Sequence, residues 1–210
     1  MTLAVPVRRP VLADLIARPS DRVRAFALDA ALVVAGALFV AALAQVEIPL
    51  QPVPITGQTL GVVVVGAALG ARRGAAALTT YLLAGLAGLP VFAGFTGSIA
   101  AVAKPSFGFI IGFVFAAFVA GWFAERAWDR KPVLAFVGFV AASAIPFVFG
   151  IPYMAFILNV VGGGTYGFAD ILQFGLWPFI VGGLIKAAVA ALLIPAAWWA
   201  VRQADRTKRS

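Results

Sequence analysis

Lys186 is the residue of this sequence best placed to do chemistry, because it is a cation inside a long apolar run. Trp177 and Trp198 flank it, about 31 Å apart along a helix. That separation is typical of the two aromatic belts of a membrane span. Lys186 would lie roughly 14 Å from the level of Trp177. An ionisable group at that depth costs several kcal/mol and is usually kept for a function.

Two interpretations of Lys186 remain open from the residues alone. Its ammonium group either binds a small organic anion in an apolar pocket, or it is hydrogen-bonded to backbone carbonyls as part of the framework. Gly182 and Gly183 lie four and three residues earlier, on the same face of the predicted helix. They clear space beside the cation, either for a ligand or for a closely packed helix. The ligand-binding interpretation is favoured.

The residue types needed for catalysis or metal binding are scarce. The sequence has no His and no Cys, and no two of its eight Asp and Glu residues lie together inside an apolar run. Metal sites and acid–base pairs need such clusters, and the sequence has no phosphate-binding Gly-rich motif. A serine enzyme would have to combine Lys186 with Ser98, Ser106 or Ser143. We therefore expect a protein that is not an enzyme and that carries no metal or cofactor.

Membrane helices must position these residues, because 63% of the chain is hydrophobic and only 11% is charged. A helix of about 20 apolar residues spans a bilayer. The sequence predicts six such segments, at 26–44, 58–71, 74–89, 106–124, 132–160 and 172–201. The second and third are short, and Pro146 and Pro152 are expected to interrupt the fifth. We expect an all-α integral-membrane six-helix bundle at 26–201, with a basic segment at 1–25 and a basic tail at 202–210.

The positive charges predict how this bundle is oriented. Of the sixteen Lys and Arg residues, all but Lys104 and Lys186 lie in four short stretches between or beyond the apolar segments. Cytoplasmic loops are enriched in Lys and Arg, so both termini and the connections at 72–73 and 126–131 are expected in the cytoplasm. The net charge of +8 then reflects orientation and contact with anionic lipid, and not binding of nucleic acid.

The N-terminal part allows alternative interpretations. Residues 42–44 (ALA) resemble a signal-peptidase site, but the preceding apolar run is longer than the about 7–15 residues of a signal-peptide core. An uncleaved first helix is therefore favoured. Residues 1–25 form either a short surface helix or a basic tail.

The predicted outer connection at 48–58 contains Pro49, Pro52 and Pro54. Three prolines in six positions make it an extended and stiff strap. It is either a rigid linker or, as its apolar character favours, a lid over a pocket.

Four motifs resemble the BioY family, the biotin-specific substrate-binding (S) components of energy-coupling factor (ECF) transporters. They are 52–59 (PVPITGQT), 85–93 (GLAGLPVFA), 105–113 (PSFGFIIGF) and 178–186 (PFIVGGLIK), supported by Leu69, Gly70, Gly74 and Tyr81. The resemblance implies six helices, biotin as the ligand, and a transmembrane coupling protein with ATPase subunits as partners. ATP would be used only by those partner subunits, and the expected location is the bacterial inner membrane.

The resemblance also implies an outward-opening site under the first outer connection. Its expected residues are Lys186, Tyr81, Gln58, Thr56 and Phe92. The family pattern has Asp three residues before the lysine, where this chain has Gly183. Lys186 must then find another counter-charge, and the candidates are the ligand carboxylate, Asp170 and Glu47.

Small residues on the first helix are the expected docking surface for the partner. The alanines recur at four-residue spacing, which lets another helix approach closely; they are Ala27, Ala31, Ala35, Ala37 and Ala41. Intramolecular packing is the alternative. The sequence as a whole predicts biotin uptake by an S component. The alternative is an autonomous secondary transporter or an oligomeric carrier for biotin or another small organic anion, although an ion-coupled carrier would usually contain intramembrane acids.

Overall fold

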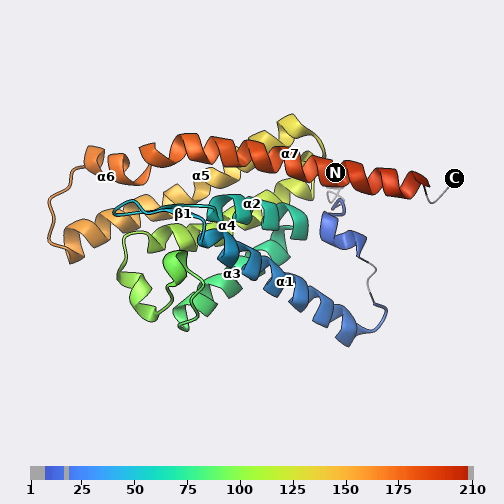
Figure 1. Ribbon diagram of the computed structural model, residues 1–210, viewed down its shortest axis with the longest axis horizontal. Coiled ribbons are helices and arrows are strands. Elements are labelled where there is room, and N and C mark those ends of the chain that lie inside the picture. Colours follow the sequence, from blue (N-terminus) through green and yellow to red (C-terminus); the bar gives the residue numbers. More distant parts are fainter. Residues whose placement is uncertain (1–7, 17–18, 208–210) are drawn as a thin grey trace, which may run out of the picture.

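The computed structural model shows an elongated bundle of helices (Figure 1) and describes residues 8–16 and 19–207. The helices are α1 (Arg22–Ala44), α2 (Gln58–Leu69), α3 (Ala71–Leu86), α4 (Phe107–Ala124), α5 (Pro132–Phe156), α6 (Phe168–Gly175) and α7 (Trp177–Thr207). The shorter elements are η1 (Leu12–Leu15), β1 (Glu47–Ile48), β2 (Ile55–Thr56), η2 (Ala93–Phe95), η3 (Ile99–Ala103), η4 (Trp128–Arg130) and a π-helical turn, η5 (Ile157–Val161). The remaining parts of the predicted basic segments, at 1–7, 17–18 and 208–210, lie outside the described residues.

Four helical stretches are long and apolar enough to cross a membrane, by length and composition. Within the described residues they are Arg22–Ala44, Phe107–Ala124, Pro132–Val161 and Phe168–Ala204. The predicted all-α membrane fold is therefore confirmed. The second and third predicted segments correspond to α2 and α3, which have 12 and 16 residues and reach only about 18 and 24 Å.

The short helix α2 is largely buried in the protein, whereas α3 buries one side and leaves Leu83 59% exposed. Eight of the twelve residues of α2 are buried, and α2 and α3 both pack on α4. Glycines permit this close approach: a Cβ on Gly66 would lie 2.4 Å from the Ala117 carbonyl oxygen, and one on Gly74 would lie 2.9 Å from Gly66 Cα. Backbone that does not span the bilayer is tolerated at membrane depth when protein surrounds it.

The structure differs from the sequence-based prediction in the last two segments. Pro146 and Pro152 lie inside one continuous helix, α5, and do not interrupt it. Membrane helices tolerate proline when neighbouring groups compensate for the lost hydrogen bond. The sixth segment is divided at Leu176, whose backbone (φ −124°, ψ −62°) is not helical. The chain therefore enters the bundle as α6, bends, and continues as the long helix α7.

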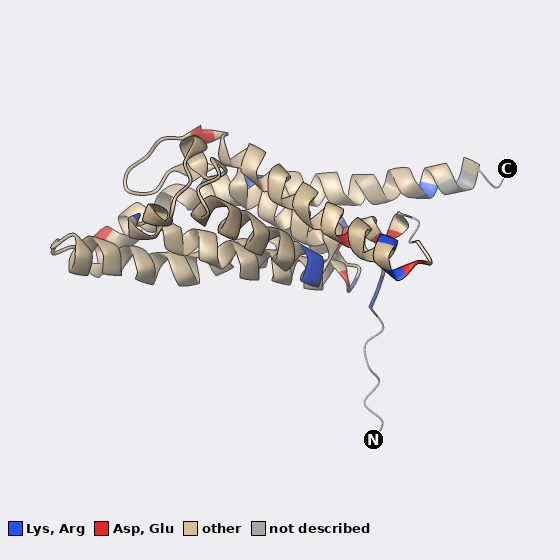
Figure 2. Cartoon of the chain, turned by 90° about the horizontal axis from the view of Figure 1, so that it is seen from below, with Lys and Arg blue, Asp and Glu red and all other residues tan. Residues whose placement is uncertain are grey.

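Most charged residues gather at the end of the bundle that carries both chain termini (Figure 2). There, residues 8–16 are neither a surface helix nor a free tail, because the Val11 side chain is fully buried in the core. Asp14 pairs with Arg8 and Arg73, and Arg8 pairs with Glu125 at 3.1 Å. Burial acts to raise the pKa of Asp14, but its hydrogen bond from Val11 and the two arginines outweigh burial and hold that pKa below its usual value. These contacts hold residues 8–16 against the start of α3 and the end of α4.

The predicted outer strap folds back on itself as a small hairpin. Glu47 pairs with Thr56 and Ile48 with Ile55 in an antiparallel ladder between β1 and β2. The prolines lie in the connection between these strands, where no ladder hydrogen bond is needed. The hairpin covers the end of the bundle opposite the charged cluster and forms the roof of the cavity described next.

Candidate binding cavity

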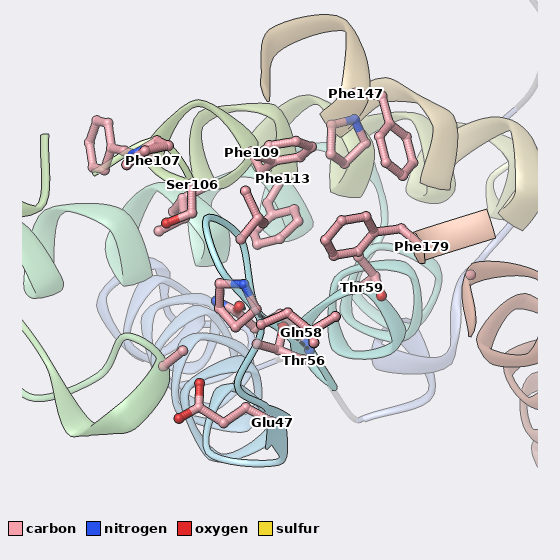
Figure 3. A pocket seen from close by; sticks show the side chains of 18 of the residues that line it. Glu47, Thr56, Gln58, Thr59, Ser106, Phe107, Phe109, Phe113, Phe147 and Phe179 are labelled. Atoms are coloured by element: carbon pink, nitrogen blue, oxygen red, sulfur yellow. Dashed lines mark hydrogen bonds between the residues drawn. The ribbon is translucent and has the colours of Figure 1, made fainter. Parts of the chain in front are cut away.

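A cavity of about 630 Å³ lies beneath the hairpin (Figure 3). It is lined by the hairpin itself, the start of α2, the connection between α3 and α4, and the facing sides of α4, α5 and α7. Most lining residues are apolar, and the charged ones are Glu47, Lys104 and Lys186. Pockets of this size and character commonly hold small organic molecules.

Three aromatic rings, one from each of α4, α5 and α7, form one wall. Phe109 lies 5.8 Å from Phe147 in an edge-on arrangement and 6.3 Å from Phe179 in a stacked one, and Phe147 and Phe179 are also 6.3 Å apart. Offset and edge-on pairs at these distances are favourable. The three rings give the cavity a rigid apolar surface.

Lys186 lines the cavity and donates a hydrogen bond from Nζ to the carbonyl oxygen of Thr56 at 2.5 Å. The structure thus shows the hydrogen bond to backbone that the second interpretation expected, in a residue that also lines the cavity. No acidic side chain forms an ion pair with it among the described residues. An ammonium group has three donors, and the bond to Thr56 uses one of them.

A chain of side-chain contacts links Thr56 through Gln58 and Tyr81 to Phe92. The Thr56 hydroxyl donates to Gln58 Oε1 at 2.7 Å, and Gln58 Nε2 donates to the Tyr81 hydroxyl at 2.6 Å. The Tyr81 ring meets Phe92 edge-on at 5.4 Å. Thr56, Gln58 and Phe92 line the cavity, whereas Tyr81 lies behind them. Tyr81 therefore supports the wall.

Gln45, at the end of α1, fixes the connection that carries Phe92. Its Nε2 donates to the Phe92 carbonyl at 3.2 Å, and its Oε1 accepts from the Phe95 N–H at 2.8 Å. The Phe92 ring covers Gly85, where a Cβ would lie 2.1 Å from the ring. Glycine at this position thus permits the ring to reach the cavity.

The structure does not bring Asp170 to the cavity. Asp170 is exposed in the first turn of α6, where its Oδ2 accepts from the Gly167 N–H at 2.9 Å. Glu47, by contrast, is a lining residue, as is Gly183. A Cβ on Gly183 would have no neighbour within 4 Å, so there is room for a side chain at the position where the family pattern has Asp.

Several lining residues were missed by reasoning from the sequence. Thr59 and Phe109 lie within two of the family motifs, and Ser143 was considered only as a nucleophile, but none of them was assigned to the site. Phe147 was not named, because it lies in a helix that is apolar on all sides. Phe179, by contrast, was placed on the helical face of Lys186 by the sequence, because it lies seven residues earlier.

The predicted docking alanines of α1 divide between two faces. Ala31 and Ala35 are exposed along one side of the helix, whereas Ala37 and Ala41 are 7% and 9% exposed and belong to the core. Two residues along a helix correspond to a rotation of about 200°, which carries Ala37 to the side opposite Ala35. Ala37 and Ala41 are therefore packing residues of the bundle, which corrects their assignment to a docking surface.

The fold and the cavity define a multi-pass membrane protein that encloses a site for a small solute. The BioY family model matches residues 17–203, and the chain belongs to the BioY family. It is 41% identical to the biotin transporter BioY of Rhizobium etli over 174 residues, covering 80% of this chain and 87% of that protein. It is 35% identical to the biotin transporter BioY of Thermotoga maritima, covering 71% and 83%.

A solved structure has the same fold. It is the S component for biotin from an ECF-type ABC transporter, with a TM-score of 0.67 and 23% sequence identity, covering 85% of this chain and 94% of that chain.

Proposed function

We propose that this chain takes up biotin as the membrane-embedded S component of an ECF-type transporter. The observation that carries the proposal is the cavity, whose lining combines a half-buried cation, Lys186, with a wall of three phenylalanine rings. Biotin combines a carboxylate and a polar ureido group with an apolar ring and chain, and each part has a complement there. The BioY proteins that this chain resembles are named as biotin transporters. The function is transport and not catalysis.

Lys186 is the proposed charged contact of the ligand, with Thr56, Gln58 and Phe92 around it. Tyr81 is assigned a supporting role, because it does not line the cavity. Its hydroxyl accepts a hydrogen bond from Gln58, and its ring packs edge-on against Phe92. Asp170 is left out of the site, since it caps α6 on the surface. The hairpin between β1 and β2 is the proposed lid.

The proposed topology has six membrane passages, with both termini on the cytoplasmic side of the bacterial plasma membrane. Four passages are the long apolar helices, and α2 and α3, which both pack on α4, would supply two short ones. The gathering of charged residues at the end that carries both termini (Figure 2) supports this orientation. The hairpin and its cavity would then face outward, as uptake requires.

The proposed partners are a transmembrane coupling protein and ATPase subunits. The solved structure with the same fold comes from such a transporter. In this chain, Ala31 and Ala35 form an exposed row of small residues on α1, and such a row lets a partner helix approach closely. ATP would be used by the partner subunits.

The function is tested by purifying the chain in detergent and identifying small molecules bound to it by mass spectrometry, followed by calorimetric titration with biotin. We expect biotin to be retained and to bind stoichiometrically. A folded protein that neither retains nor binds biotin would overturn the proposal. Uptake of radiolabelled biotin into liposomes that contain this chain alone would instead identify an autonomous carrier.

A further inference from the structure

A stripe of exposed aromatic side chains runs along one side of α4, away from the cavity. It consists of Phe115, Phe118 and Trp122, whose spacing of three and four residues places them on one face of the helix. Phe115 also stacks on Phe149 of α5 at 4.7 Å, so the apolar surface extends to the neighbouring helix. In a membrane protein such a surface lies against the acyl chains of lipids.

A cation lies at the end of this stripe, on the charged end of the bundle. Arg126 follows Trp122 by four residues, and its guanidinium carbon lies 3.4 Å from the centroid of the Trp122 ring. Its Nη1 donates to the Trp122 carbonyl oxygen at 3.0 Å. Cation–π stacking thus holds the group in one place. Arg126 is exposed, and no acidic side chain pairs with it among the described residues.

A second exposed cation lies near the last turn of α4. Gly121 packs against the start of α3, where its Cβ would lie 2.3 Å from the backbone nitrogen of Ala71. The next residue is Arg72, which is exposed and forms no ion pair within the described part of the chain. The Glu125 carboxylate is engaged, because it accepts from the Ala71 N–H at 3.0 Å and pairs with the N-terminal segment. Arg72 and Arg126 therefore leave positive charge without a counter-charge beside the stripe.

The other stacked arginine at this end of the molecule is occupied. Arg130 lies 4.3 Å from the centroid of the Trp198 ring. However, Arg130 Nη2 donates to the Pro10 carbonyl at 2.9 Å, and Trp198 is buried. The pair of Arg126 and Trp122 differs, because both of its members are exposed.

We infer that α4 carries a binding site for one anionic phospholipid, whose phosphate is held by Arg126 and Arg72 and whose acyl chain lies against Phe118 and Trp122. Guanidinium groups bind phosphate oxygens in pairs of hydrogen bonds. Tryptophan rings favour the membrane–water interface, which is also the level of anionic headgroups. The inference goes beyond the proposed function, because it requires neither biotin nor a partner protein.

Native mass spectrometry of the full chain in detergent tests the site, with phosphatidylglycerol and phosphatidylcholine of identical acyl chains. The parent should bind phosphatidylglycerol at least about tenfold more tightly, the effect of one hydrogen bond to a charged group. Arg126→Gln should lose most of this preference. Arg202→Gln is the matched control, because it removes the same charge from an exposed position on α7. Equal affinities of the parent for the two lipids, or equal losses in the two variants, would overturn the inference. If Arg126→Gln does not fold, Arg72→Gln takes its place.

Two further measurements separate a lipid from a free ion and locate it. Inorganic phosphate should not displace bound phosphatidylglycerol, because it lacks acyl chains; displacement would assign the arginines to a soluble anion and overturn the inference. In bilayers of phosphatidylcholine, brominated phosphatidylglycerol should quench the fluorescence of Trp122, measured as parent minus Trp122→Phe, more strongly than brominated phosphatidylcholine at the same mole fraction. Equal quenching by the two lipids would also overturn it.

Discussion

At the scale of single residues, Lys186 combines a cavity-facing charge with one backbone partner. Lys186→Ala should weaken biotin binding by more than tenfold, because a hydrogen bond to a charged group is worth about 1.5–3 kcal/mol. Calorimetric titration measures the change. Lys131→Ala, which removes an exposed lysine in the connection before α5, is the control and should bind as the parent does. Unchanged affinity in a folded Lys186→Ala protein would remove Lys186 from the site.

Gly183 offers a test of the departure from the family pattern. A Cβ there meets nothing within 4 Å, so Gly183→Asp should fit, and its carboxylate would lie one helical turn from Lys186. We expect it to bind biotin at least as tightly as the parent. Gly183→Ala is the companion variant, because it tests space without charge. A large loss of affinity in both variants would mean that the ligand itself occupies the space beside Gly183.

Asp129 makes the stability of the protein depend on pH. It is 1% exposed in η4, and burial raises its pKa to about 6, although a 2.6 Å hydrogen bond from Trp198 Nε1 and the charge of Arg130 act to lower it. Between pH 3.8 and 6 the folded state therefore binds more protons than the unfolded state. Stability conferred by protonated Asp129 is thus lost as the pH rises through that interval.

The expected loss is about 3 kcal/mol, at 1.36 kcal/mol per pKa unit. Thermal unfolding in detergent from pH 4 to pH 7.5 measures it, as the difference between the parent and Asp129→Asn. Relative to the parent, Asp129→Asn should gain stability as the pH rises, because the amide keeps an acceptor for Trp198 without a charge. Parallel pH profiles for the two proteins would assign the pH dependence to other groups.

Part of the site could be predicted from single residues and part could not. Lys186 could be singled out from the sequence because a charge within an apolar run costs free energy and is usually kept for a function. Thr56, Gln58 and Phe92 were identified by motifs in irregular segments. Phe147 was not named, because only the packed structure shows which side of α5 lines the cavity.

At the scale of elements, we expect large substitutions on the two faces of α1 to have different effects, on partner docking and on stability. Ala31→Trp places a large side chain on the exposed face, so it should abolish partner-dependent uptake of biotin in cells while leaving biotin binding by the purified protein intact. Ala37→Trp would overpack the core, which costs typically about 1–3 kcal/mol, and should lower the thermal stability. If Ala31→Trp supports normal uptake, the partner docks elsewhere or none is required.

The helices themselves were largely predictable, and their irregularities were not. Long apolar runs bounded by charged residues locate membrane helices, because a segment that spans the bilayer must be apolar, long and helical. The unbroken course of α5 through Pro146 and the bend at Leu176 depend on neighbours: a Cβ on Gly112 would lie 2.6 Å from Pro146 Cα, so α4 packs closely at that point. Helices that are apolar on every side carry no pattern that separates the cavity-facing side from the lipid-facing one.

At the scale of the whole molecule, the proposed orientation can be tested with single cysteines, because the native sequence contains none. Asp170→Cys at the start of α6 should react with a membrane-impermeant maleimide in intact spheroplasts. Lys131→Cys, before α5, should react only after the membrane is permeabilised. Both positions are exposed in the structure, so the difference reports the side of the membrane. Reversed labelling would invert the topology.

The length of α7 gives the molecule a lever. Helical structure continues from Lys186 in the cavity wall to Thr207, and the C-terminal end of α7 extends beyond the rest of the bundle (Figure 1). Thr207 lies 21 residues beyond Lys186, roughly 31 Å along the helix, so each degree of tilt pivoted at the cavity displaces the far end by about half an ångström. Pro195 lies within this stretch, and the helix continues through it. A small tilt of α7 at the cavity would therefore become a larger displacement at the opposite end of the molecule.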